Sequence, residues 1–99
     1  MRYSATIEAR MTSTRLPGKV MLQAAGQPFL QHMINRLKQV PSLDQIILAT
    51  TINHQDDVLV DLAESNGIKY FRGSEDDVLG RVLLSAESFG TDVIVQTTG

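Results

Sequence analysis

The sequence contains no cysteine, and this absence excludes disulfide bonds and thiolate metal sites. It also has no apolar run as long as a membrane-spanning helix, and its first residues, MRYSATI, lack the continuous apolar core of a signal peptide. A cytoplasmic location without a membrane partner is expected by default. The net charge of −2 argues against nucleic acid as a partner, because nucleic-acid-binding surfaces carry a basic patch or stripe.

The composition is that of an ordinary globular domain. Of the 99 residues, 42% are hydrophobic and 20% are charged, which is unlike a disordered chain. This length is sufficient for one domain with a modest core, but it is small for an enzyme that must hold two substrates. No linker, low-complexity segment or internal repeat divides the chain.

Hydrophobic patterning predicts four strands that alternate with three helices. The strands are expected at Tyr3–Ala9, Ile46–Thr50, Ile68–Phe71 and Asp92–Gln96, and the helices from Phe29 to near Pro41, from about Gln55 to Asn66, and from Glu75 to Gly90. This alternation predicts an α/β fold with a mainly parallel sheet, helices on both faces and right-handed crossovers. The first strand is expected at the centre of the sheet and the third near an edge.

Several residues at the ends of these elements have specific predicted roles. Pro28 is expected to be the first residue of its helix, and Asp56 and Asp57 are expected in the first turn of the second helix, where carboxylates favour the helix dipole. Gly67 and Gly90 are expected to end the second and third helices. The predicted buried stripe of the third helix is Val78, Leu79, Val82, Leu83, Ala86 and Phe89.

A polar loop, I-E-A-R-M-T-S-T-R-L-P-G-K at residues 7–19, continues from the first predicted strand. Arg10, Arg15 and Lys19 lie within ten residues among Thr and Ser hydroxyls, and Pro17-Gly18 sets a bend. Such cations, together with free backbone N–H groups, suit a polyphosphate. The loop matches neither GxxxxGK[ST] nor GxGxxG, and on composition alone an ordinary solvated loop fits about equally well.

Two motifs carry a resemblance to a known family. A-R-M-T-S-T-R-L-P-G-K-V-M-L at residues 9–22 and F-R-G-S-E-D-D-V-L-G-R at residues 71–81 resemble the spore coat polysaccharide cytidylyltransferases, relatives of the enzymes that make CMP-activated sialic acid and CMP-activated 3-deoxy-octulosonate. The likeness extends over the whole chain. It implies the N-terminal part of a Rossmann-like nucleotide-diphospho-sugar transferase fold. It also implies a CTP-dependent enzyme that forms a CMP-activated sugar and pyrophosphate for polysaccharide synthesis.

The resemblance also implies a set of site residues. Arg10 and Lys19 would hold the triphosphate of CTP as catalytic cations, because preorganised cations stabilise the charge that develops on the phosphoryl oxygens. Arg72 would read the cytosine base, whose pairing edge accepts guanidinium donors. The implied nucleotide-binding set is Ala9, Arg10, Ser13, Arg15, Lys19 and Arg72.

These assignments have competing interpretations. The alternative for Arg15 is a salt bridge to Glu8 or another carboxylate. The alternative for Arg72 is a surface ion pair with Glu75 or Asp76. Arg81 either faces the site or lies on a solvated helix face. Glu8 departs from the family, which more often has Gln there, and a carboxylate beside a triphosphate would repel it unless the side chain points away.

Magnesium is the cofactor that the resemblance implies. In the family an Asp that holds the ion follows the fourth strand, at a position that would come after Gly99, so no metal ligand is expected within the chain. The carboxylates of residues 75–77 are expected to cap and charge-complement the third helix instead. The chain is therefore expected to be the first part of a longer enzyme, with a homodimer built in the full-length protein.

Two other functions are compatible with the same residues. One is a nucleotide-binding module that keeps the polar loop but does not catalyse, and the other is a different sugar or cofactor nucleotidyltransferase of the same fold. The apolar residues 93–95 are a predicted association site, since an unpaired strand edge is a template for pairing.

Overall fold

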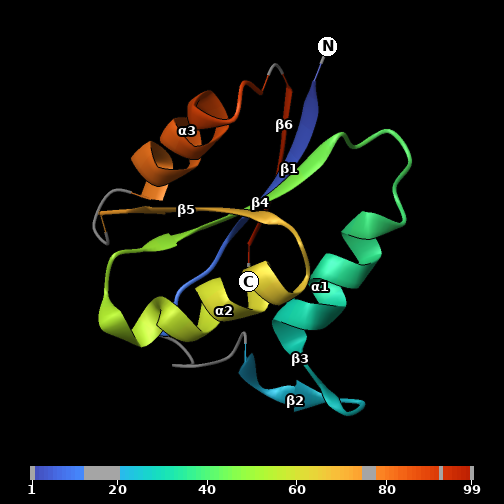
Figure 1. Cartoon of the computed structure of the whole chain (residues 1–99), viewed down its shortest axis with the longest axis vertical. Coiled ribbons are helices and arrows are strands. Elements are labelled where there is room, and N and C mark those ends of the chain that lie inside the picture. Colours follow the sequence, from blue (N-terminus) through green and yellow to red (C-terminus); the bar gives the residue numbers. More distant parts are fainter. Residues whose placement is uncertain (1, 13–20, 75–77, 92, 99) are drawn as a thin grey trace.

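Four parallel strands form the centre of the fold, in the order β5-β4-β1-β6. β1 (Tyr3–Glu8) lies between β4 (Gln45–Thr51) and β6 (Val93–Thr98), and β5 (Lys69–Gly73) pairs with the other side of β4 (Figure 1). The computed structural model describes residues 2–12, 21–74, 78–91 and 93–98. The predicted central position of the first strand and edge position of the third are both confirmed.

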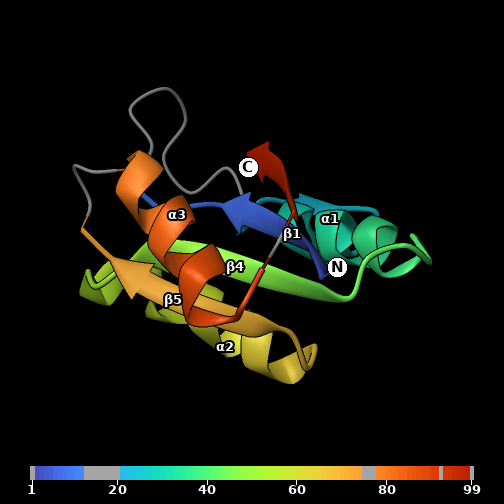
Figure 2. The same ribbon diagram turned by 90° about the horizontal axis from the view of Figure 1, so that it is seen from above.

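Helices cover both faces of this sheet, as predicted. α1 (Phe29–Lys38) and α2 (Asp57–Ser65) lie on one face, and α3 (Val78–Ser88) lies on the other (Figures 1 and 2). The main-chain order is therefore the predicted alternation of four strands with three helices. None of the helices in the described part of the chain is long and apolar enough to cross a membrane.

The face covered by α1 and α2 has an aliphatic core. β4 is buried along six of its seven residues, because it has a neighbour on each side and a helix layer on each face. α1 and α2 each pack an apolar stripe against this face of the sheet. The buried cluster consists of Ile7, Ala9, Leu30, Ile34, Ile46, Leu48, Leu59 and Ala63.

The face covered by α3 carries polar side chains beside aliphatic ones such as Ile47. Alternate residues of β1 and β4 point to it, and these include Ser4, Glu8 and Gln45. Gln45 Nε2 donates to Ser4 Oγ at 2.8 Å and to the Phe89 carbonyl at 3.1 Å. The hydroxyls of Ser4 and Thr91 also lie 2.8 Å apart, so buried polar groups at this end are satisfied by one another.

The buried stripe of α3 differs from the predicted one. Val82 and Ala86 are buried as expected, but Leu83 is 52% exposed and Arg81 is 1% exposed. The helix is thus rotated so that Arg81 and Ser85 face the sheet. The physical reason is the polar sheet face, which offers Glu8 as a partner for Arg81. Solvation of Arg81 on the helix surface, one of its two interpretations, is therefore wrong.

The segments that precede α1 and α2 also differ from the predictions. A hairpin of β2 (Gln23–Ala24) and β3 (Gln27–Pro28) precedes α1, and its turn residues, Ala25 and Gly26, have φ of 51° and 81°, as two-residue hairpin turns require. Pro28 is the N-cap of α1 and not its first residue. The segment His54–Asp56 forms a 3₁₀ turn, η2, before α2 begins.

The predicted helix ends are confirmed. Gly67 and Gly90 follow α2 and α3 with φ of 69° and 66°, which glycine adopts without steric cost. The predicted start of the third helix at residues 75–77 lies outside the described residues. β6 pairs with β1 alone among the described strands, so residues 93–95 do lie at an edge, and their predicted association stays a prediction.

Candidate nucleotide site

The carboxyl ends of the parallel strands bring three polar segments to one edge of the sheet. Glu8 at the end of β1 lies opposite Ala49 of β4 and Thr98 of β6, and Thr51 of β4 lies opposite Gly73 of β5. The strand order also reverses at β1, because β4 and β5 lie on one side of it and β6 on the other. In open α/β sheets, ligands bind outside the carboxyl ends at such a switch point.

The backbone is anchored on both sides of Arg10. The Ala9 N–H donates to the Ala49 carbonyl at 3.2 Å, and the Met11 N–H donates to Asp56 Oδ1 at 2.7 Å. Ala9 itself belongs to the core, so its backbone and not its side chain is available to a ligand. Ser13, Arg15 and Lys19 lie outside the described residues.

Asp56 is a residue of this edge that the sequence did not reveal. Its side chain is fully buried, and its second oxygen accepts a short hydrogen bond from the Thr51 hydroxyl. A carboxylate at the start of a helix is common, so Asp56 was predicted only to favour the dipole of α2. Its contact with Met11, 45 positions away in the sequence, is tertiary and leaves no local sequence signal.

Arg72 is held by three groups of the segment that follows β4. Its Nε donates to the Thr51 carbonyl and its Nη2 to the Asn53 carbonyl, both at 2.8 Å, and its Nη1 lies 2.8 Å from Asp57 Oδ1. The Arg72 side chain stays 25% exposed. Arg72 therefore forms an ion pair with Asp57, whereas Glu75 and Asp76, its alternative partners, lie outside the described residues.

The Glu8 side chain points toward Arg81 of α3. It forms a buried ion pair with Arg81, whose Nη2 lies 2.5 Å from Glu8 Oε1 and whose Nη1 donates to the Ser74 carbonyl at 2.6 Å. A Cβ atom on Gly73 would lie 2.9 Å from Cγ of Arg81, so the glycine leaves room for the arginine stem. The negative charge of Glu8 is thus paired with a fixed cation.

The described residues do not fit a magnesium site. They contain no group of three His, Cys, Asp or Glu side chains that could hold a metal ion. The carboxylates at this edge also have other partners, since Glu8 is paired with Arg81, Asp56 with Met11, and Asp57 with Arg72.

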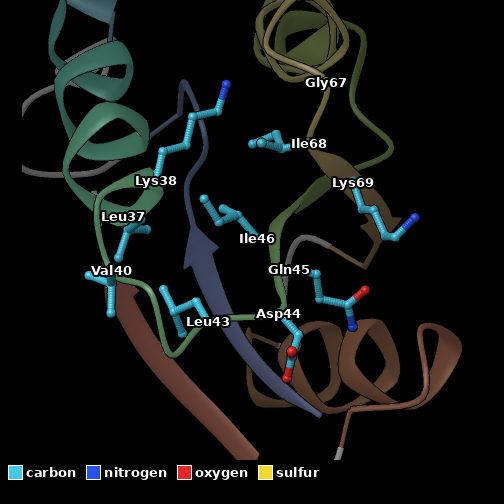
Figure 3. Close-up of a pocket in the computed structure, with 10 residues that line it drawn as sticks. All are labelled: Leu37, Lys38, Val40, Leu43, Asp44, Gln45, Ile46, Gly67, Ile68 and Lys69. Atoms are coloured by element: carbon cyan, nitrogen blue, oxygen red, sulfur yellow. The ribbon is translucent and has the colours of Figure 1, made fainter.

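A pocket of about 330 Å³ lies at the opposite edge, beside the amino ends of β4 and β5 (Figure 3). It is lined by Leu37, Lys38, Val40, Leu43, Asp44, Gln45, Ile46, Gly67, Ile68 and Lys69. The two lysines diverge: Lys38 Nζ donates to the Asn66 carbonyl at 2.7 Å, and Lys69 Nζ lies 5.4 Å from the centre of the Phe89 ring. Because its polar groups do not converge, the pocket is less suited to a charged ligand than the carboxyl edge.

The parallel sheet, its switch point and the polar carboxyl edge define an open α/β fold of the Rossmann-like class, in which ligands bind at the carboxyl edge. Residues 5–99 match the Cytidylyltransferase family, and the chain belongs to that family. The resemblance seen in the two motifs is therefore confirmed.

Three relatives illustrate the family. An uncharacterized protein of Methanocaldococcus jannaschii, MJ1063, is 42% identical over all of this chain and 41% of its own length. The spore coat polysaccharide biosynthesis protein SpsF of Bacillus subtilis is 36% identical over 94% of this chain and 40% of its own. The 3-deoxy-manno-octulosonate cytidylyltransferase of Geobacter sulfurreducens is 31% identical over all of this chain and 39% of its own. The chain thus spans about two-fifths of the length of these relatives.

Two solved structures share the fold. A cytidylyltransferase from Leptospira borgpetersenii superposes with a TM-score of 0.93 at 38% identity, over 99% of this chain and 41% of that one. A CMP:2-keto-3-deoxy-manno-octonic acid synthetase complexed with CTP superposes with a TM-score of 0.78 at 24% identity, over 99% and 40%. The Rossmann-like cytidylyltransferase fold predicted for the chain is confirmed.

Proposed function

We propose that this chain is the CTP-binding part of an enzyme that transfers CMP to a sugar or sugar acid and releases pyrophosphate. The observation that carries the proposal is the anchoring of the backbone on both sides of Arg10 at the switch point of the sheet, with Arg72 held at the same carboxyl edge by Thr51, Asn53 and Asp57. The names of two relatives, a 3-deoxy-manno-octulosonate cytidylyltransferase and a spore coat polysaccharide biosynthesis protein, support this reaction and a role in polysaccharide synthesis.

The roles of the site residues follow from the charge of the substrate. A sugar hydroxyl attacks the α-phosphorus, a new oxygen–phosphorus bond forms, and the bond to the leaving pyrophosphate breaks. Arg10 and Lys19, with help from Ser13 and Arg15, would bind the triphosphate and stabilise the charge that builds on its oxygens. Arg72 would direct remaining N–H donors to the cytosine base, which its quarter exposure permits.

Magnesium is part of the proposal for the full-length enzyme, with its ligands outside this chain. Without such ligands, the chain by itself is proposed to bind CTP and not to turn it over. A homodimer of the full-length protein and a cytoplasmic location stay predictions. The sugar is a second substrate whose recognition the described residues do not explain.

The test is calorimetric titration of this chain with CTP, with UTP, GTP and ATP as controls at the same salt concentration. Selective binding of CTP supports the proposal. Arg10→Ala should weaken every nucleoside triphosphate by about tenfold or more, because charged hydrogen bonds to phosphate are lost. Arg36→Ala is the matched control, since Arg36 is an exposed arginine in the last turn of α1 and should change nothing.

Arg72→Ala separates base recognition from phosphate binding. It should reduce the preference for CTP over UTP while leaving UTP affinity nearly unchanged. If it weakened all four nucleotides equally, the base-reading role would be wrong even with a correct phosphate site. If the folded chain bound no nucleotide, or bound all four alike, the proposed CTP function would be refuted.

A further inference from the structure

The two arms of the proposed site are joined by one continuous set of hydrogen bonds. On one side, Asp56 accepts from the Met11 N–H, one residue beyond Arg10. On the other side, Asp57 holds Arg72. These two carboxylates are consecutive in the sequence, yet they bind segments that come from different strands, β1 and β5.

The residues between these contacts complete the connection. The Thr51 hydroxyl donates to Asp56 and accepts from the Asn53 N–H, whose nitrogen lies 3.1 Å from Thr51 Oγ1. The carbonyls of Thr51 and Asn53 are in turn the acceptors for Arg72. The segment from Thr51 to Asp57 therefore contacts the polar loop and Arg72 at the same time.

The difference in burial between the two carboxylates indicates different tasks. Asp56 is fully buried, and its two carboxylate oxygens accept hydrogen bonds from the Met11 N–H and the Thr51 hydroxyl. The Asp57 side chain is 46% exposed and also contacts His54 Nδ1 at 3.0 Å. A buried carboxylate with two donors, such as Asp56, can fix the position of a backbone segment. A partly exposed carboxylate, such as Asp57, can orient a long side chain.

We infer that Asp56 and Asp57 are positioning residues of the nucleotide site. Asp56 fixes the backbone next to Arg10, the cation proposed to bind the triphosphate, and Asp57 orients the arginine that reads the base. This inference rests on the proposed CTP function. Neither residue touches the nucleotide, so each acts through its partner: Asp56 through the Met11 backbone and Asp57 through the Arg72 guanidinium.

The test compares CTP, CMP and UTP binding in matched variants of this chain. Asp56→Ala should lower the affinity for CTP by about tenfold and that for CMP much less, because only the triphosphate needs the loop. Asp57→Ala should reduce the preference for CTP over UTP by several-fold while leaving the ratio of CTP to CMP affinity unchanged. The two substitutions thus change different ratios, which a loss of overall stability would not do.

If Asp56→Ala does not fold, a conservative variant provides the same test. Asp56→Asn keeps an acceptor for the Met11 N–H but loses the charge, so it should lower the ratio of CTP to CMP affinity by about threefold. Exchange of the Met11 amide proton, followed by NMR without nucleotide, should be faster in Asp56→Asn than in the parent chain. Asp57→Ala is the control and should leave this exchange rate unchanged.

The possible results distinguish a failure of the positioning roles from a failure of the proposed CTP function. If the parent chain selects CTP but every Asp56 and Asp57 variant weakens the three nucleotides by one common factor, positioning is refuted and the CTP function stands. If the parent chain does not select CTP, both are refuted. An unchanged Met11 exchange rate in Asp56→Asn would also overturn the role of Asp56.

Discussion

The two faces of the sheet are stabilised by different chemistry. The face beneath α1 and α2 is filled by aliphatic side chains, which gain free energy in proportion to the area they bury. The face beneath α3 holds Ser4, Glu8 and Gln45, together with Arg81 from the helix, and these groups are satisfied by specific partners. The face beneath α1 and α2 tolerates substitutions that change side-chain shape, whereas the face beneath α3 depends on particular pairs of polar residues.

The polar face also reaches the candidate site. Arg81 joins Glu8 at the end of β1 to Ser74 after β5, so it links the two strands that lead into the motifs with Arg10 and Arg72. A buried ion pair contributes little net stability in general, because desolvation offsets the attraction. We therefore expect this pair to fix the relative position of the ends of β1 and β5 rather than to add stability.

The largest expected effect is the loss of one partner of this pair. Arg81→Met leaves Glu8 as a buried and unpaired carboxylate, so we expect the free energy of unfolding to fall by about 3–5 kcal/mol. Chemical denaturation of the variant and the parent chain measures this difference. The double variant Glu8→Leu, Arg81→Met is the control and should recover most of the loss, because no charge is left buried. A double variant as unstable as the single one would show that packing of the arginine stem, not charge, dominates.

The same difference between aliphatic burial and specific polar pairs explains how well the sequence predicts each face. The strand and helices around the aliphatic face were predicted at the right places, because the apolar run of β4 and the apolar periodicity of α1 and α2 are local signals, although Phe29 and Val58 are exposed. On the polar face the pattern indicated Leu83 as buried and left Arg81 undecided. Hydrophobic periodicity does not predict a buried arginine. The partner of Arg81 is Glu8, 73 positions away in the sequence, so the contact leaves no local signal.

The candidate site shows the same limit. The motif around Arg10 and the place of Arg72 after the third strand follow from local sequence and resemblance. Asp56 does not, because its partner Met11 is brought near by the pairing of β1 with β4. The roles predicted for Ser13, Arg15 and Lys19 stay predictions.

A smaller effect is expected from truncation on the aliphatic face. Leu48 is fully buried in β4, so Leu48→Ala should lower the free energy of unfolding by about 3 kcal/mol through lost burial and a residual cavity. Leu84→Ala is the control, because Leu84 is a half-exposed leucine of α3 and should cost about 0.5 kcal/mol or less. The affinity of folded Leu48→Ala for CTP should match that of the parent chain. A selective loss of CTP affinity would contradict the separation of the two faces.

The smallest expected effect tests the space that Gly73 leaves for Arg81. An added Cβ would lie 2.9 Å from Cγ of Arg81 and 3.2 Å from Cε1 of Phe71, so Gly73→Ala should lower the free energy of unfolding by about 1–2 kcal/mol. Arg81 cannot easily yield, because its guanidinium is held at both Glu8 and Ser74. In an Arg81→Ala background the stem is gone, and the cost of Gly73→Ala should fall below half of its value in the parent chain. An equal cost in both backgrounds would mean that Phe71 or the backbone, and not the buried arginine, requires glycine at this position.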